Sequence, residues 1–126
     1  MAEIGENLAL VIGAWMDATR IGSMDPVIAL MDADVVWYGF LPGTVCNGKA
    51  EVGAFLSRHQ RRPPRVTRIE AVERGETIIA CLEGPDFLHP GTGQPRSEAF
   101  MRVTLERGRI KEMRGVATRE EALAGI

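Results

Sequence analysis

The side chains of this chain that could transfer a proton near neutral pH are few. Asp86 and His89 lie within the segment 84–90, and His59 lies at the end of an expected helix. A carboxylate and an imidazole over a pocket could act as an acid–base pair, because histidine titrates near neutrality. The structural alternative is that Asp86 and His89 stabilise a turn, since glycine and proline flank them. His59 could likewise only interact with the helix dipole.

Metal and phosphate binding have no recognisable motif. The two histidines and the two cysteines, Cys46 and Cys81, are scattered and lack the spacing of a metal site. No glycine-rich phosphate-binding loop of the required form occurs. We therefore expect no metal and no cofactor. We also expect both cysteines to be reduced and buried, as in a cytoplasmic protein.

Composition limits the remaining function classes. The chain has 126 residues, with 15 Lys and Arg against 17 Asp and Glu, and 45% hydrophobic residues. These values predict one globular domain over residues 1–126. The slightly acidic balance argues against a nucleic-acid partner. No apolar run reaches the roughly 18 residues of a membrane helix, and the N-terminus lacks the pattern of a signal peptide.

The elements that must position these side chains are helical in the first half. An apolar stripe at steps of three and four predicts a long first helix; its members are Ile4, Leu8, Val11, Ile12, Trp15 and Thr19. Asp25-Pro26 predicts the start of a short second helix with Met31 on its apolar face. A strand is expected over 34–40, and a third helix over 49–60 that ends before Pro63-Pro64.

The second half predicts four strands, at about 65–74, 77–88, 96–106 and 109–117, with glycines between them. Short turns make such strands antiparallel neighbours. In 96–106 the odd positions are mostly apolar and the even ones mostly polar, so one face of the sheet packs on the helices. Thr118 and Glu121 form a capping box for a C-terminal helix. The predicted class is α+β with a curved, mostly antiparallel sheet.

This order of elements resembles the nuclear-transport-factor-2-like superfamily, and within it the SnoaL-like polyketide-cyclase branch. The resemblance covers nearly the whole chain; its carrying stretches are residues 15–18, 25–31, 34–37, 47–52 and 108–111. It implies a cone in which helices lie in the hollow of a curved sheet, with a pocket for a small apolar molecule at the open end. Members include ketosteroid isomerases, limonene epoxide hydrolases and polyketide cyclases, and many are homodimers.

The catalytic groups of two of those enzyme classes are missing at the matching positions. A ketosteroid isomerase-like site would place a tyrosine at Trp15 and an aspartate base at Gly39. A limonene epoxide hydrolase-like site would place arginine and aspartates at Leu82, Gly84 and Gly115. For an enzyme, the remaining hypothesis is a polyketide cyclase-like or isomerase/hydrolase-like activity that uses Asp86, His89 or His59.

The resemblance predicts a pocket with an apolar lining. Its expected members are Trp15, Trp37, Gly39, Phe55, Leu82, Gly84, Ala99, Met101, Met113 and Gly115. Aromatic and methionine side chains commonly hold an apolar ligand, and we expect the glycines to leave room for it. The alternative is that these residues close a core. A one-residue register slip would exchange this set for a charged one.

The other face of the sheet carries charges of both signs, including Glu98, Arg102 and Arg114, among apolar residues such as Phe100 and Ile110. This mixture suits an exposed sheet or a two-fold interface. The favoured function is binding of a small apolar molecule by a homodimer. The alternatives are the acid–base enzyme described above and a protein-interaction module that uses this face.

Overall fold

The computed structural model describes residues 5–38, 43–59 and 63–124. These residues form four helices and six strands. In chain order they are α1 (Glu6–Ile21), α2 (Asp25–Ala29), β1 (Met31–Tyr38), β2 (Val45–Asn47), α3 (Lys49–His59), β3 (Arg68–Arg74), β4 (Thr77–Leu88), β5 (Pro95–Glu106), β6 (Arg109–Val116) and α4 (Arg119–Leu123). Of these helices, none is long and apolar enough to cross a lipid bilayer.

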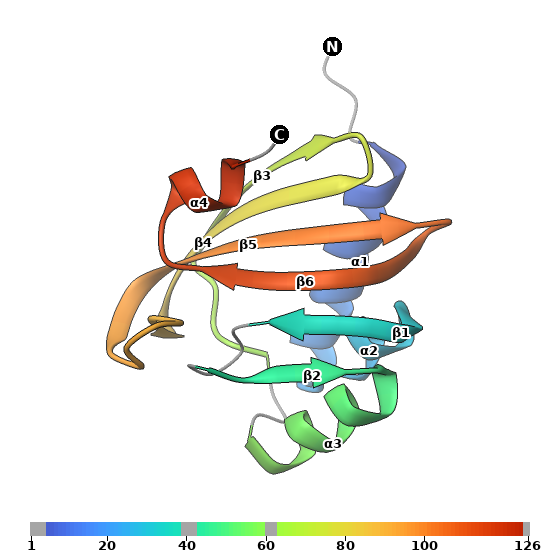
Figure 1. Ribbon diagram of the computed structural model, residues 1–126, viewed down its shortest axis with the longest axis horizontal. Helices are drawn as coiled ribbons and strands as arrows, with labels where there is room; N and C mark the ends of the chain where they lie inside the picture. The colour runs from blue at the N-terminus through green and yellow to red at the C-terminus, as the bar shows by residue number, and fades with distance from the viewer. Residues whose placement is uncertain (1–4, 39–42, 60–62, 125–126) are drawn as a thin grey trace.

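The six strands form one sheet in the order β2-β1-β6-β5-β4-β3. All neighbours are antiparallel except β1 and β6, which run parallel. In Figure 1, α1 and α2 lie behind the sheet, α3 lies beyond β2, and α4 lies near the opposite end. The predicted α+β class, with helices against a curved and mostly antiparallel sheet, is confirmed.

The predicted alternation along β5 sets which side chains face the helices. Ala99, Val103 and Leu105 are buried and Met101 is partly buried, whereas Glu98 on the other face is exposed. The odd positions of this strand therefore point to the core, as expected.

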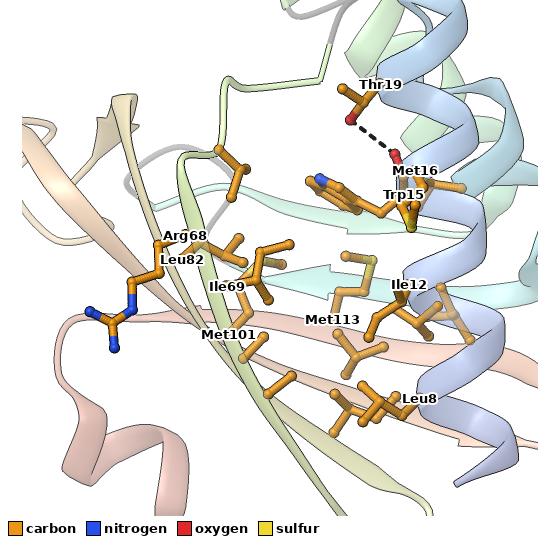
Figure 2. A pocket seen from close by; sticks show the side chains of 18 of the residues that line it. Leu8, Ile12, Trp15, Met16, Thr19, Arg68, Ile69, Leu82, Met101 and Met113 are labelled. Carbon is orange, nitrogen blue, oxygen red and sulfur yellow. Dashed lines mark hydrogen bonds between the residues drawn. The ribbon is translucent and has the colours of Figure 1, made fainter. Parts of the chain in front are cut away.

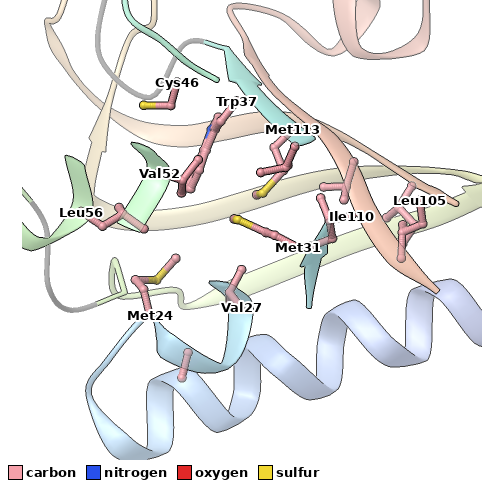
Figure 3. Packing of buried hydrophobic residues seen from close by; sticks show 14 of the residues in the cluster. Met24, Val27, Met31, Trp37, Cys46, Val52, Leu56, Leu105, Ile110 and Met113 are labelled. Carbon is pink, nitrogen blue, oxygen red and sulfur yellow. The ribbon is translucent and has the colours of Figure 1, made fainter. Parts of the chain in front are cut away.

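The main core lies between this inner face and helices α1, α2 and α3. Figure 3 shows Met31 and Met113 meeting near its centre, with Val27 on the helix side. Met31 is fully buried but begins β1 rather than continuing the second helix, which corrects the predicted boundary. It pairs with Ile110, whose N–H donates to the Leu30 carbonyl oxygen at 2.9 Å. A five-residue helix is weak alone, so pairing in the sheet decides where it ends.

Ile110 corrects a second prediction. The regular alternation placed it on the outer face, yet its side chain is fully buried. The pairing of β5 with β6 shifts between Thr104 and Leu105, and such a bulge reverses which side chains face inward beyond it. The turn between β5 and β6 has positive φ at Arg107 and Gly108, the geometry of a tight hairpin.

The outer face is partly covered by the chain itself. Thr118 Oγ1 accepts a hydrogen bond from the Glu121 N–H at 3.1 Å, which confirms the predicted cap of α4. The helix places Ala122 against Ile79, Val116 and Phe100. The apolar residues expected at an interface in this region therefore pack under α4.

The position of α1 over the sheet depends on a contact with β3. The N-cap of α1 is Gly5, which has no side chain to accept a hydrogen bond. Glu73 of β3 takes this role, because its Oε1 accepts from the Leu8 N–H at 2.7 Å. A carboxylate at a helix N-terminus also interacts favourably with the helix dipole. This bond ties one end of α1 to the edge of the sheet.

Candidate functional site

A cavity of about 580 Å³ lies between α1 and the inner face of the sheet (Figure 2). Helix α1 and strands β3, β4 and β5 provide most of its wall. The lining residues are Leu8, Val11, Ile12, Trp15, Met16, Thr19, Arg20, Val27, Val66, Thr67, Arg68, Ile69, Ala71, Ile78, Ala80, Leu82, Met101, Val103, Ile110 and Met113. A cavity of this size matches the range that holds small organic ligands.

The apolar stripe of α1 forms one wall, as its spacing requires. Leu8 is buried, and Ile12 and Trp15 are partly buried on the same face of the helix. The opposite wall contains two small residues, Ala71 of β3 and Ala80 of β4, which are paired across the strands. Their side chains do not reach far toward α1, so the gap between helix and sheet stays open.

The cavity opens between α1 and β3. Met16 and Ile69 lie on its rim and are 65% and 45% exposed. Figure 2 shows Met16 on the helix side and Ile69 on the strand side of this space. An apolar molecule could therefore enter without crossing a layer of charged side chains.

The described lining contains no carboxylate, imidazole, thiol or phenol. Its polar side chains are two threonines, two arginines and one indole. The threonine hydroxyls donate to main-chain carbonyl oxygens, Thr19 to Trp15 at 3.0 Å and Thr67 to Glu83 at 3.2 Å. Arg20 and Arg68 are each paired with a nearby carboxylate outside the lining. No described side chain in this wall is suited to general acid–base catalysis near neutral pH.

The indole of Trp15 is the exception to this pattern of satisfied polar groups. Its Nε1 atom is buried and has no hydrogen-bond partner among the residues that the structure describes. Figure 2 shows the ring extending from α1 with its nitrogen on the edge away from the helix. Buried donors are almost always paired in folded proteins, so this N–H is available to a bound molecule.

A second, smaller cavity of about 120 Å³ shares Trp15, Leu82 and Met101 with the large one. It also borders Asp86 and Arg96. The Arg96 guanidinium donates to the carbonyl oxygens of Ala117 and Val116 at 2.9 and 3.0 Å. This arginine therefore fastens the chain after β6 to β5.

Asp86 is held in an ion pair rather than directed at a reacting group. Its carboxylate accepts three hydrogen bonds from Arg65, two from the guanidinium at 2.8 and 3.0 Å and one from the backbone N–H at 2.9 Å. These bonds lower the pKa of Asp86 to about 2; those from the Arg65 side chain have the largest effect, and the one from its backbone N–H has the next largest. A carboxyl group with this pKa is ionised at neutral pH and is a weak base.

His89 stabilises the turn after β4. Its Nδ1 accepts hydrogen bonds from the Gly91 and Thr92 N–H groups at 3.0 and 3.1 Å. His89 lines neither cavity, and no described contact joins it to Asp86. The predicted His59 ends α3, and its side chain lies outside the described residues.

Several solved structures have the same fold as this chain at low sequence identity. A candidate polyketide cyclase from Xanthomonas campestris pv. campestris matches with a TM-score of 0.66 and 18% identity, covering 94% of each chain. TerC co-crystallized with polyporic acid matches at 0.65 and 17%, over 90% of this chain and 92% of that one. A nuclear-transport-factor-2-like protein of unknown function from Burkholderia xenovorans LB400 matches at 0.63 and 19%, over 87% and 81%.

The chain has the nuclear-transport-factor-2-like fold. The predicted resemblance to SnoaL-like and related proteins is thus confirmed for the fold. No protein-family model matches the sequence, and no curated protein matches it either.

Within this nuclear-transport-factor-2-like fold, the structure separates the predicted pocket residues into groups. Trp15, Leu82, Met101 and Met113 line the large cavity. Trp37, Ala99 and Gly115 border the small one. Phe55 packs against the main core instead of lining a cavity. Gly39 lies outside the described residues.

Gly84 has a different role from the expected one. A Cβ atom at this position would overlap the Arg65 carbonyl oxygen. The glycine thus lets the segment before β3 cross β4 closely, and it does not leave room for a ligand. The same close crossing brings Arg65 to Asp86.

The sequence interpretation missed the wall formed by β3 and the segment before it. Ile69 and Ala71 pair with Leu82 and Ala80, so they share the inner face with them. The signal was present in the hairpin at Gly75: counting outward from that turn places Ala71 opposite Ala80.

The two cysteines offer no reactive thiol to this site. Burial raises the pKa of Cys46 and of Cys81, which disfavours the thiolate. Among the described residues, no three His, Cys, Asp or Glu side chains lie together as a metal site.

Proposed function

We propose that this protein binds a small, mostly apolar molecule in the cavity between α1 and the sheet. One observation carries the proposal: a cavity of about 580 Å³ whose described lining is mostly aliphatic, aromatic or methionine and contains no acid–base group. An enzyme of the acid–base type needs a proton-transferring group in reach of its substrate. The described wall supplies none, so binding explains the geometry better than catalysis.

Two further features support a ligand in this place. The opening lies between the exposed Met16 and Ile69, which gives an apolar molecule a route inward. A structure with the same fold, TerC, was co-crystallized with polyporic acid. The fold therefore accommodates organic ligands in at least one of its members.

The test is a thermal-shift screen with steroids, aromatic polyketides, lactones, epoxides and fatty acids at fixed protein concentration. A ligand at about 100 times its dissociation constant stabilises the folded state by roughly 2.7 kcal/mol, which corresponds to several degrees in a domain of this size. Polar molecules of similar size serve as controls. A screen in which no apolar class raises the melting temperature at saturating concentration would contradict the proposal.

The sheet face supports a proposal of self-association. Outside the region covered by α4, the Arg114 guanidinium lies 4.0 Å from the centre of the Tyr38 ring. Val45 is 44% exposed on the neighbouring edge strand β2 and pairs with Tyr38. We propose that a two-fold dimer uses this surface. Light scattering of the wild type and of Val45→Lys tests it: the mass should fall to that of one chain in the variant.

A further inference from the structure

The unpartnered indole N–H of Trp15 restricts the chemistry of the ligand. An indole nitrogen donates a hydrogen bond and cannot accept one. Nε1 is buried without a partner in the described part of the chain, although burial of an unpaired donor is unfavourable. A bound molecule with an accepting atom would satisfy it.

Trp15 is well placed to meet such a molecule. It lines the large cavity and the small one, and Leu82 and Met101 lie with it on both linings. The nitrogen lies on the edge of the ring away from α1 (Figure 2). A ligand in the large cavity can therefore reach the indole while the rest of its surface contacts aliphatic side chains.

The charges around the cavity favour a neutral ligand. Arg20 and Arg68 lie in the lining, but their side chains are 73% and 62% exposed. Arg20 is paired with Asp17 at 3.1 Å, and Arg68 with Glu70 by a contact of 2.6 Å. In the large cavity, a buried carboxylate or ammonium on the ligand would lose its hydration and find no buried counter-charge among the described lining residues. Arg96, whose Nε is also buried without a described partner, borders only the small cavity.

Among neutral groups, a carbonyl fits best. A hydroxyl would bring a donor of its own into a wall whose described side-chain acceptors, the hydroxyl oxygens of Thr19 and Thr67, belong to exposed residues. A ketone, quinone, aldehyde or ester oxygen only accepts. We propose that the ligand is a neutral apolar carbonyl compound whose oxygen accepts a hydrogen bond from Trp15 Nε1. This inference rests on the proposed function, because it assigns a ligand class to the same cavity.

The test compares 9-fluorenone with fluorene, which has the same ring system without the carbonyl oxygen. Affinities are measured for the wild type and for Trp15→Phe, which keeps an aromatic ring but removes the N–H. We expect fluorenone to lose about tenfold in affinity, the size of a good neutral hydrogen bond, and fluorene to change by less than about twofold. Met101→Leu is the matched control: it lines both cavities without a hydrogen bond, so it should change both affinities by the same factor.

A spectroscopic measurement follows the hydrogen bond itself. In protein labelled with ¹⁵N at the indole nitrogens, the Trp15 signal is the one lost in Trp15→Phe. Its proton should move downfield when fluorenone binds and not when fluorene binds. Equal losses for both probes, or no downfield shift, would overturn the carbonyl assignment while the binding function stands. If neither probe bound at saturation while the thermal-shift screen identified a ligand without a carbonyl group, the carbonyl assignment would be wrong and the binding function would stand; if the screen were flat as well, the proposed function would be wrong too.

Discussion

Replacement of Ala80 by leucine tests whether the cavity is empty space in solution. Ala80 lies on the inner face of β4, between Ala71 of β3 and Met101 of β5, and lines the large cavity. The change adds three carbon atoms, each worth about 0.8 kcal/mol when fully buried. Loss of leucine rotamer freedom opposes this by about 0.5–1 kcal/mol. We expect Ala80→Leu to increase the free energy of unfolding by about 1.5 kcal/mol and the melting temperature by about 5–7 °C.

The same substitution at Ala18 is the matched control. Ala18 of α1 is fully buried in the main core and lines neither cavity. Leucine there would overpack the core, which typically costs about 1–3 kcal/mol. Urea unfolding of both variants gives the comparison. If Ala80→Leu were as destabilising as Ala18→Leu, the space would be filled in solution and the binding proposal would lose its basis. Ala80→Leu should also weaken any ligand found by the thermal-shift screen.

Three further substitutions test other features of the structure. Gly84→Ala should destabilise the fold by about 2 kcal/mol or more, because its Cβ would overlap a backbone oxygen; Gly13→Ala, in open space on α1, should instead stabilise it by about 0.5–1 kcal/mol. Both are read from urea unfolding. The folded-state pKa of Asp86, about 2, is below its ordinary 3.8. The ion pair therefore stabilises the fold fully above pH 3.8, and this stabilisation is lost as the pH falls toward 2. In Asp86→Asn, the melting temperature should change less with pH over this interval. Glu73→Ala should destabilise by about 1 kcal/mol through loss of the α1 cap, and Glu73→Gln, which keeps an acceptor, by less; equal losses in chemical denaturation would argue against that cap.

The sequence was most informative where a pattern is local and regular. The stripe of α1 placed Leu8, Ile12 and Trp15 on one face because residues three and four apart are neighbours on a helix. The alternation in β5 placed Ala99 and Met101 inward because successive side chains of a strand point to opposite faces. These two patterns contain seven of the residues that line the large cavity: Leu8, Val11, Ile12, Trp15, Thr19, Met101 and Val103.

Features that depend on contacts between distant segments could not be predicted in this way. A bulge reverses the facing of Ile110, and nothing in its own neighbourhood marks that shift. Gly84 is required by the carbonyl of Arg65, which is far along the chain and crosses over it. The same crossing gives Asp86 its partner, so a residue that looked like a candidate acid–base group is an ion-pair residue. Three-residue β2 is too short to show a periodic pattern.

The cavity itself follows from a mismatch between its two walls. Helix α1 presents large side chains, and its N-terminus is held to β3 by the Glu73 carboxylate. Opposite it, the sheet presents the paired Ala71 and Ala80, where larger residues would close the gap. An empty space beside apolar side chains lowers the stability of the fold. A molecule that binds only the folded state would raise that stability by mass action. The small residues of the sheet therefore keep the cavity open, and in our proposal the indole of Trp15 selects the chemistry of the ligand that occupies it.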